Sequence, residues 1–258
     1  MRAEPRGYLE HGLQSSAFLI AVFEFVLLLF SLSFHECAHA WMSSRLGDQT
    51  ARLQGRVTLN PMYHVDPVGT LLFPAIIIFG PFFGFNLFSG LLVGWAKPTP
   101  VITRNFQKIN RDDNLTTLAG PVSNLILVLI SVLVLVVFCI AVPGGRELVI
   151  ASLRLVFANL ISGIAVNAPS GVQAIAVLAI LAVEINLSLF YFNLLPIPPL
   201  DGSRLLRNLL PYRAMQTYDR IPIWVSYLFM IFLGGYILHL LIDPSMELVF
   251  TPFLHLNP

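Results

Sequence analysis

The chain has 258 residues, of which 56% are hydrophobic, 12% aromatic and only 11% charged, with a net charge of +1. A soluble domain carries about 25% charged residues, so this chain has too little charge to cover a water-exposed surface. The near-zero net charge and the many aromatic residues exclude an intrinsically disordered chain and a nucleic-acid-binding protein. The composition, with a mean hydropathy of +0.78, therefore predicts a single integral membrane domain over residues 1–258.

Apolar segments along the chain predict the membrane-spanning helices, each of which needs roughly 20 mostly apolar residues. Four full spans are expected, at residues 17–34 (continuing as a helix to about 45), 119–142, 171–195 and 221–242. Residues 69–94 are interrupted by prolines and glycines, which predicts a broken or re-entrant hairpin. The segment 148–166 contains an arginine and several small residues, so a span and an interfacial helix are both open. The expected fold is an all-α bundle of about four to six transmembrane helices, with a core at about 17–212 and an additional C-terminal helix at about 221–242.

The basic residues predict the orientation of these spans. Eleven of the fifteen lysines and arginines lie in three polar segments, at 45–67, 97–113 and 203–220. Because lysine and arginine concentrate in cytoplasmic loops, all three segments are expected on the cytoplasmic side. The segment 69–94 then enters and leaves on that side, 148–166 becomes an element of the outer side, and both termini lie outside.

A metal-binding pattern lies at the end of the first predicted span, at His35-Glu36-Cys37-Ala38-His39. Residues four apart share one face of a helix, so the two imidazoles can bind one metal while Glu36 takes a proton from a bound water. An accidental match in a chain of this length occurs at roughly the one-per-cent level. Ionisable groups at the edge of a bilayer are costly and usually functional, which favours a metal site over polar residues that merely cap a span.

A catalytic zinc needs a third protein ligand and one open position for water. Asp201 follows the span 171–195, and the loop charges place it on the same side of the membrane as His35 and His39. Asn193 precedes a proline-rich break in the same segment and is suited to donate a hydrogen bond to a developing oxyanion. The alternative interpretation is an ordinary loop with an Asp-Gly turn, and the HExxH pattern favours the ligand.

Three motifs resemble the signatures of the site-2 protease family of intramembrane zinc metalloproteases, peptidase family M50: FHECAHA, AGPVSN and NLLPIPPLDG. The segments GRVTLNPMYHVDPVGTLLFP and GWAKPTPV are similar to the short prokaryotic branch without PDZ or CBS domains. The resemblance implies that His35, His39 and Asp201 bind one Zn²⁺ per chain, that Glu36 is the general base and that Asn193 assists at the scissile carbonyl. It also implies a small re-entrant β-hairpin or strand element near the active site, with extended strands at 51–60 and 95–101 that can pair with an unwound substrate.

The expected protein is therefore a zinc metalloendopeptidase of a prokaryotic cytoplasmic membrane, with its active site toward the cytoplasm. Its expected partners are the transmembrane segments of protein substrates and the lipid bilayer, and not nucleic acid. Two alternatives stay open, namely a transporter that conducts protons or metal ions and a catalytically silent scaffold of the same family.

The roles of four further polar residues have two interpretations each. Glu24 and Glu184 lie within predicted spans, where intramembrane acids can relay protons or can be neutral and hydrogen-bonded. His64 is either a metal or substrate contact or, more simply, a local hydrogen-bonding residue. Asn124, in AGPVSN, is expected to be an interhelix hydrogen-bond partner near the site rather than a ligand.

Overall fold

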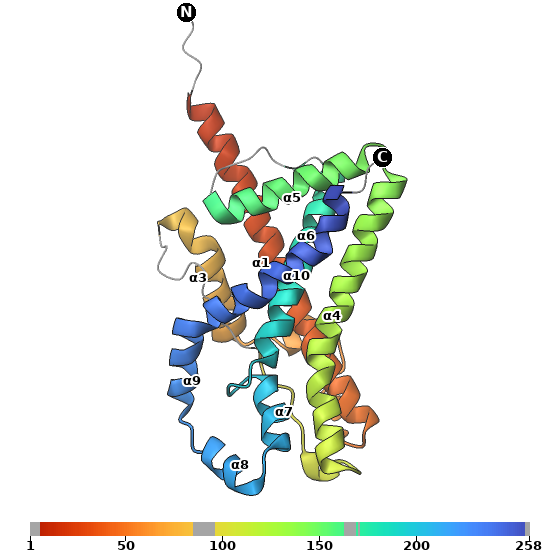
Figure 1. Ribbon diagram of the computed structural model, residues 1–258, viewed down its shortest axis with the longest axis vertical. Helices are drawn as coiled ribbons and strands as arrows, with labels where there is room; N and C mark the ends of the chain where they lie inside the picture. Colours follow the sequence, from red (N-terminus) through yellow and green to blue (C-terminus); the bar gives the residue numbers. More distant parts are fainter. Residues whose placement is uncertain (1–5, 85–95, 163–168, 170, 256–258) are drawn as a thin grey trace, which may run out of the picture.

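The computed structural model describes residues 6–84, 96–162, 169 and 171–255 (Figure 1). Within these ranges the protein is helical and contains no β-strand. The longer helices are α1 (Arg6–Arg45), α4 (Ile109–Ala141), α5 (Gly145–Ser162), α6 (Gly171–Leu194) and α10 (Gly235–His255). The shorter elements are α2 (Thr50–Leu53), η1 (Pro61–Tyr63), η2 (Pro67–Leu72), α3 (Phe73–Phe79), η3 (Gly80–Phe83), η4 (Thr103–Asn105), α7 (Asp201–Leu209), α8 (Tyr212–Tyr218), α9 (Ile223–Phe229) and η5 (Met230–Gly234).

Four helical stretches of the described chain are long and apolar enough to cross a membrane: Ala17–Arg45, Ile109–Ala141, Gly171–Leu194 and Ile223–Leu254. They cover the four predicted spans to within one or two residues of the predicted ends, so these spans are confirmed. The last stretch is composite and runs through α9, η5 and α10. Large apolar side chains point outward, and on α4 Leu129, Leu133 and Ile140 are 63%, 61% and 81% exposed. Lipid is the solvent that suits such a surface.

The centre of the bundle is α6, which packs against α1, α4, α5 and α10. Of the 18 most apolar consecutive residues of α6, 61% are buried, whereas the corresponding buried share is at most 22% in the other three spans. Polar contacts fix its register against two neighbours, because Asn186 Nδ2 donates to Ser31 Oγ of α1 at 3.0 Å and Tyr191 OH lies 2.6 Å from Ser245 Oγ of α10. Since apolar packing drives helix association only weakly in lipid, such contacts help to specify one arrangement.

The two ends of the bundle differ. Helix α5 lies across the end at which α1 begins and α10 finishes (Figure 1), and it is not one of the helices apolar enough to span. For its described part, up to residue 162, this arrangement agrees with the expectation that the segment 148–166 is not a separate crossing, and its place on the outer side stays a prediction. The opposite end holds α7, α8, the end of α1 and the start of α4 (Figure 1), so the basic segments gather there.

The small re-entrant β-hairpin expected near the active site is not seen in the described residues of the interrupted segment 69–94. Their part of it is helical, through η2, α3 and η3, and residues 85–95 lie outside the described ranges. Asp66 starts this helical segment, because its Oδ1 accepts hydrogen bonds from the backbone N–H groups of Val68 and Gly69 at 3.0 and 2.7 Å. Proline at the first helical position, Pro67, is also favourable.

The expected strand at 51–60 is wrong at its beginning, where the chain forms the short helix α2. Asp48 favours this turn, since its Oδ1 accepts from Thr50 N at 3.1 Å and from Thr50 Oγ1 at 2.5 Å. Within the other expected strand, at 95–101, residues 96–101 form neither helix nor ladder. A single backbone bond, from Lys97 N to His64 O at 2.9 Å, connects that segment to the loop that precedes η2.

Candidate metal centre

The last turns of α1 present both histidines of the HExxH pattern on one face, toward α4. Their side chains are buried, with residue exposures of 3% for His35 and 6% for His39. Gly120 of α4 makes this approach possible, because a Cβ added there would lie 2.3 Å from His39 Nε2 and 2.6 Å from His35 Nε2. The glycine of the AGPVSN motif therefore provides the space that the two rings occupy.

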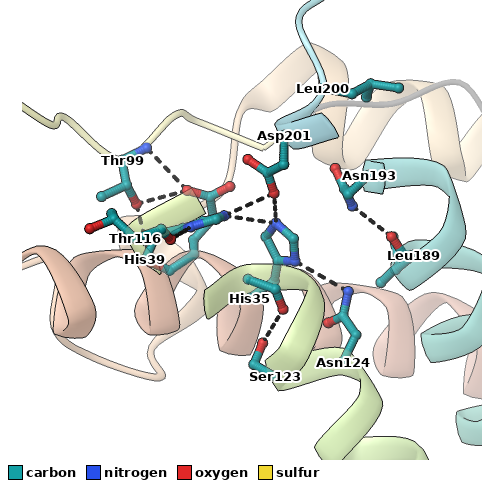
Figure 2. A network of polar contacts seen from close by, with 12 residues as sticks. His35, His39, Thr99, Thr116, Ser123, Asn124, Leu189, Asn193, Leu200 and Asp201 are labelled. Carbon is teal, nitrogen blue, oxygen red and sulfur yellow. Dashed lines mark hydrogen bonds and ion pairs between the residues drawn. The ribbon is translucent and has the colours of Figure 1, made fainter. Parts of the chain in front are cut away.

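Asp201, the first residue of α7, completes a group of three converging atoms (Figure 2). Its Oδ2 lies 3.2 Å from His35 Nε2 and 3.1 Å from His39 Nε2, and the two Nε2 atoms are 3.0 Å apart. Ligands that bind zinc tetrahedrally at about 2.0–2.1 Å are separated by about 3.3 Å. Two imidazoles and one carboxylate at this spacing fit a catalytic zinc that keeps one position open.

Each histidine has an outer hydrogen-bond partner on α4. His39 Nδ1 lies 2.7 Å from Thr116 O, which can only accept, so this nitrogen carries the proton and Nε2 is free to bind a metal. His35 Nδ1 lies 3.2 Å from the amide of Asn124, a fully buried side chain. The nearer amide atom is Asn124 Nδ2, and Asn124 Oδ1 has no hydrogen-bond partner. In the metal-binding tautomer of His35 the Nδ1 atom carries a proton, so a turn of the Asn124 amide by 180° would bring Oδ1 into place to accept it. Asn124 is thus an interhelix partner of the site, as expected.

The charge of Asp201 is set by the same neighbours. Burial alone would raise the pKa of its carboxyl, but the electrostatic attraction of a protonated His39 and the hydrogen bonds from both imidazoles, when these carry a proton on Nε2, outweigh it. The pKa is therefore held well below its ordinary range, and Asp201 is a carboxylate at neutral pH, as a metal ligand must be.

Helix α7 is attached to α4 by a polar cluster one turn beyond Asp201. Arg204 donates from its guanidinium to Asp113 Oδ1, and Asn208 Nδ2 donates to Asp113 Oδ2 at 2.7 Å and to Asn114 Oδ1 at 2.8 Å. Asp113 is buried, so this contact fixes where α7 begins and therefore where Asp201 points. Nothing in the sequence pattern connected these residues.

Glu36 lies beside the histidines and lines the same cavity. Its Oε2 accepts two hydrogen bonds from Thr99, one from the backbone N–H at 3.0 Å and one from the hydroxyl at 2.7 Å. Thr99 belongs to the KPTP segment, which the sequence had marked only as an expected strand.

Asn193 faces the same cavity from the last turn of α6 (Figure 2). Its Nδ2 donates one hydrogen bond to Leu189 O at 2.9 Å, which leaves the second N–H of the amide available. The cavity has a volume of about 240 Å³ and is also lined by residues of segment 96–101 and by Tyr227 of α9 and Met230 of η5. The structure thus brings all five predicted site residues to one cavity.

The remaining polar residues lie outside it. Glu24 and Glu184 do not line the cavity, and a role of these two residues in proton relay stays a prediction. His64 is buried and its Nε2 lies 2.8 Å from Thr58 O, so it is a local hydrogen-bonding residue rather than a ligand of this metal group.

Comparison of the sequence with known proteins shows the family to which the chain belongs. The model of peptidase family M50 matches residues 23–235, a range that contains all the ligating side chains. The chain belongs to peptidase family M50. The M50 relatives include "Putative zinc metalloprotease YwhC" of Bacillus subtilis strain 168, which is 35% identical over 237 residues covering 88% of this chain and 89% of that protein.

A second M50 relative is "Putative zinc metalloprotease Rip2" of Mycolicibacterium smegmatis, which is 33% identical over 99 residues, 38% of this chain and 34% of that protein. No solved structure matches the chain significantly. The M50 family match and the metal-binding geometry together make this protein a membrane metalloprotease.

Proposed function

We propose that this M50 metalloprotease is an intramembrane zinc endopeptidase of the site-2 type, which hydrolyses peptide bonds within or near the transmembrane segments of other proteins. One observation carries the proposal. The Nε2 atoms of His35 and His39, in the apolar stretch Ala17–Arg45, lie within 3.0–3.2 Å of one another and of Oδ2 of Asp201, which follows the apolar helix Gly171–Leu194 after a short loop. A protease whose metal ligands lie in and directly beside spanning helices meets its substrates at the membrane.

The chain's own residues supply the acid–base chemistry. A zinc ion held by His35, His39 and Asp201 would lower the pKa of its bound water to about 7 and polarise the scissile carbonyl. Glu36, beside this position, takes the proton of the attacking water and delivers it to the leaving amine. The free N–H of the Asn193 amide faces the cavity and donates to the oxyanion that forms on the carbonyl oxygen.

The cavity sets the form in which a substrate reacts. A transmembrane helix satisfies its backbone hydrogen bonds internally, so its carbonyls are shielded from attack. A volume of about 240 Å³ admits a short extended stretch rather than a whole helix, whose diameter with side chains is about 10–12 Å. The substrate therefore unwinds locally, and main-chain hydrogen bonds to segment 96–101 can hold it open.

The distribution of basic residues supports a cytoplasmic active site. The segments 45–67, 97–113 and 203–220 carry eleven of the fifteen lysines and arginines, and they lie at the same end of the bundle as α7 and Asp201 (Figure 1). By the positive-inside rule this end faces the cytoplasm, and cleavage occurs near the cytoplasmic surface.

The proposal is tested with the purified protein in proteoliposomes that contain zinc and a single-span reporter substrate. Glu36→Gln should abolish cleavage while the zinc content, measured by elemental analysis, stays at the wild-type level. Glu147→Gln makes the same change at an exposed position of α5 and should cleave normally. Wild-type turnover in the Glu36→Gln protein would exclude the proposed mechanism.

A further inference from the structure

The contact between Thr99 and Glu36 joins the catalytic segment of α1 to a loop 63 residues away along the chain. The backbone N–H of Thr99 and its hydroxyl both lie within hydrogen-bonding distance of one atom, Glu36 Oε2. The hydroxyl is also 3.2 Å from the Glu36 backbone carbonyl. A hydroxyl has one proton to donate, and the shorter distance of 2.7 Å assigns that proton to the carboxylate.

Two donors on one oxygen have a chemical consequence. A carboxylate side chain rotates freely unless something fixes it, and hydrogen bonds to an ionised group are the stronger kind. With Oε2 occupied twice, Oε1 is the oxygen left to take a proton from water. Thr99 therefore fixes both the rotamer of Glu36 and the identity of its basic oxygen.

Thr99 is itself held firmly enough to act in this way. Two residues before it, Lys97 N donates to the carbonyl of the buried His64 at 2.9 Å. Three residues after it, Ile102 N donates to Oδ2 of the buried Asp48 at 2.7 Å. Prolines 98 and 100 flank Thr99 and restrict φ of the segment, so the donors cannot easily turn away from Glu36.

Resting on the proposed function, we propose that Thr99 is a positioning residue for the general base, and that its hydroxyl holds the Glu36 carboxylate with Oε1 directed at the water it deprotonates. Thr99 acts through Glu36 and needs no contact with the substrate. A preorganised base matters in the transition state more than in substrate binding, so the loss of the hydroxyl appears in kcat and leaves KM unchanged.

The experiment compares two variants that differ in the hydroxyl alone. Thr99→Val keeps the shape and the backbone N–H but removes the hydroxyl, whereas Thr99→Ser restores it. Because one charge-assisted hydrogen bond is lost, kcat of Thr99→Val should fall about ten- to a hundredfold, with KM within about twofold of wild type. Thr99→Ser should stay within about threefold of the wild-type kcat. Thr103→Val makes the same change at an exposed position of η4 and should leave both parameters unchanged.

Zinc content and thermal unfolding midpoint are measured for every variant. An unchanged kcat in Thr99→Val would overturn the proposal, and so would equal losses in Thr99→Val and Thr99→Ser, because the hydroxyl would then not be the group that matters. A loss of zinc or of thermal stability in Thr99→Val alone would also overturn it, since the threonine would then support the fold rather than the base.

A second readout follows the contact without using turnover. Hydrogen–deuterium exchange of the peptide containing residues 96–102 should be faster by one amide in Glu36→Ala than in wild type, because Thr99 N loses its acceptor. The Lys97 amide keeps its bond to His64 O and serves as the internal control. Unchanged exchange would mean that the contact is not formed and would overturn the proposal.

The two proposals fail in different ways. If wild type does not cleave, or if Glu36→Gln cleaves as well as wild type, the proposed function is wrong and the exchange experiment alone decides the contact. If wild type cleaves, Glu36→Gln is inactive and Thr99→Val is fully active, only the role of Thr99 is wrong.

Discussion

Replacing Gly120 with alanine should destroy the metal site while α4 stays intact. The added Cβ would lie 2.3 Å from His39 Nε2 and 2.6 Å from both Cε1 and Nε2 of His35, where ordinary contacts begin at 3.4 Å. The His39 ring, or α4 itself, must therefore move by about 1 Å. Metal sites tolerate deviations of about 0.2 Å, and a misplacement of 1 Å costs about a hundredfold in rate. We expect zinc affinity to fall at least about a hundredfold, or about 2.7 kcal/mol, and cleavage to be lost.

The helix itself gives no reason for such a loss. Alanine is favoured over glycine in a helix interior by about 1 kcal/mol, so the helicity of α4 should be preserved or improved. Zinc affinity is measured by competition with a chelator of known affinity, and cleavage by the proteoliposome assay. Gly171→Ala is the matched control, because a Cβ at Gly171 meets nothing within 4 Å. Wild-type zinc affinity in Gly120→Ala would refute the geometry proposed for the metal site.

Two further changes test the supports of the site. Asp113→Ala removes the acceptor of Arg204, so α7 should shift and zinc affinity, measured by chelator competition, should fall about tenfold. The control is Asp219→Ala, which breaks an exposed ion pair with Arg207, another residue of α7. This control should change zinc affinity less than twofold. The second change is at Asp48, whose carboxylate accepts four hydrogen bonds that outweigh the effect of burial and lower its pKa below 3.8. The ionised Asp48 side chain therefore stabilises the folded protein above pH 3.8, and this stabilisation is lost as the pH falls through the lower pKa of the folded state. The thermal midpoint of wild type should exceed that of Asp48→Asn by a constant amount above about pH 4 and converge with it at lower pH, and a pH-independent difference would contradict this assignment.

The sequence could predict the spans and the grouping of His35, His39 and Asp201, because these depend on local rules. A run of about 20 apolar residues crosses a bilayer wherever it occurs, and the spacing of His35 and His39 is a property of any helix. Asp201 could be identified as the third candidate ligand because the loop charges placed it on the same side of the membrane as the histidines. Each of these inferences needed only neighbouring residues or a count of basic ones.

The supports of the site could not be predicted in this way, since they depend on how distant segments pack. Thr99 reaches Glu36 only because segment 96–102 follows a path set by His64 and Asp48, and Asp113 meets Arg204 across 91 residues. The strand expected at 51–60 was wrong because Asp48 stabilises a helical turn at Thr50, a competition between local hydrogen bonds and an extended backbone.

The division between apolar and polar contacts explains how a lipid-facing bundle can fix His35, His39 and Asp201 relative to one another. The apolar faces of α1, α4 and α6 pack against one another, but lipid is as apolar as the helices, so this packing selects no particular register. Directional contacts at one end of the bundle supply the register: Asn124 and Thr116 orient the histidines, Asp113 fixes α7, and Thr99 fixes Glu36. Variants at these positions should therefore change zinc affinity or kcat well before they change the thermal midpoint. Variants in the apolar core of α6 should show the opposite order.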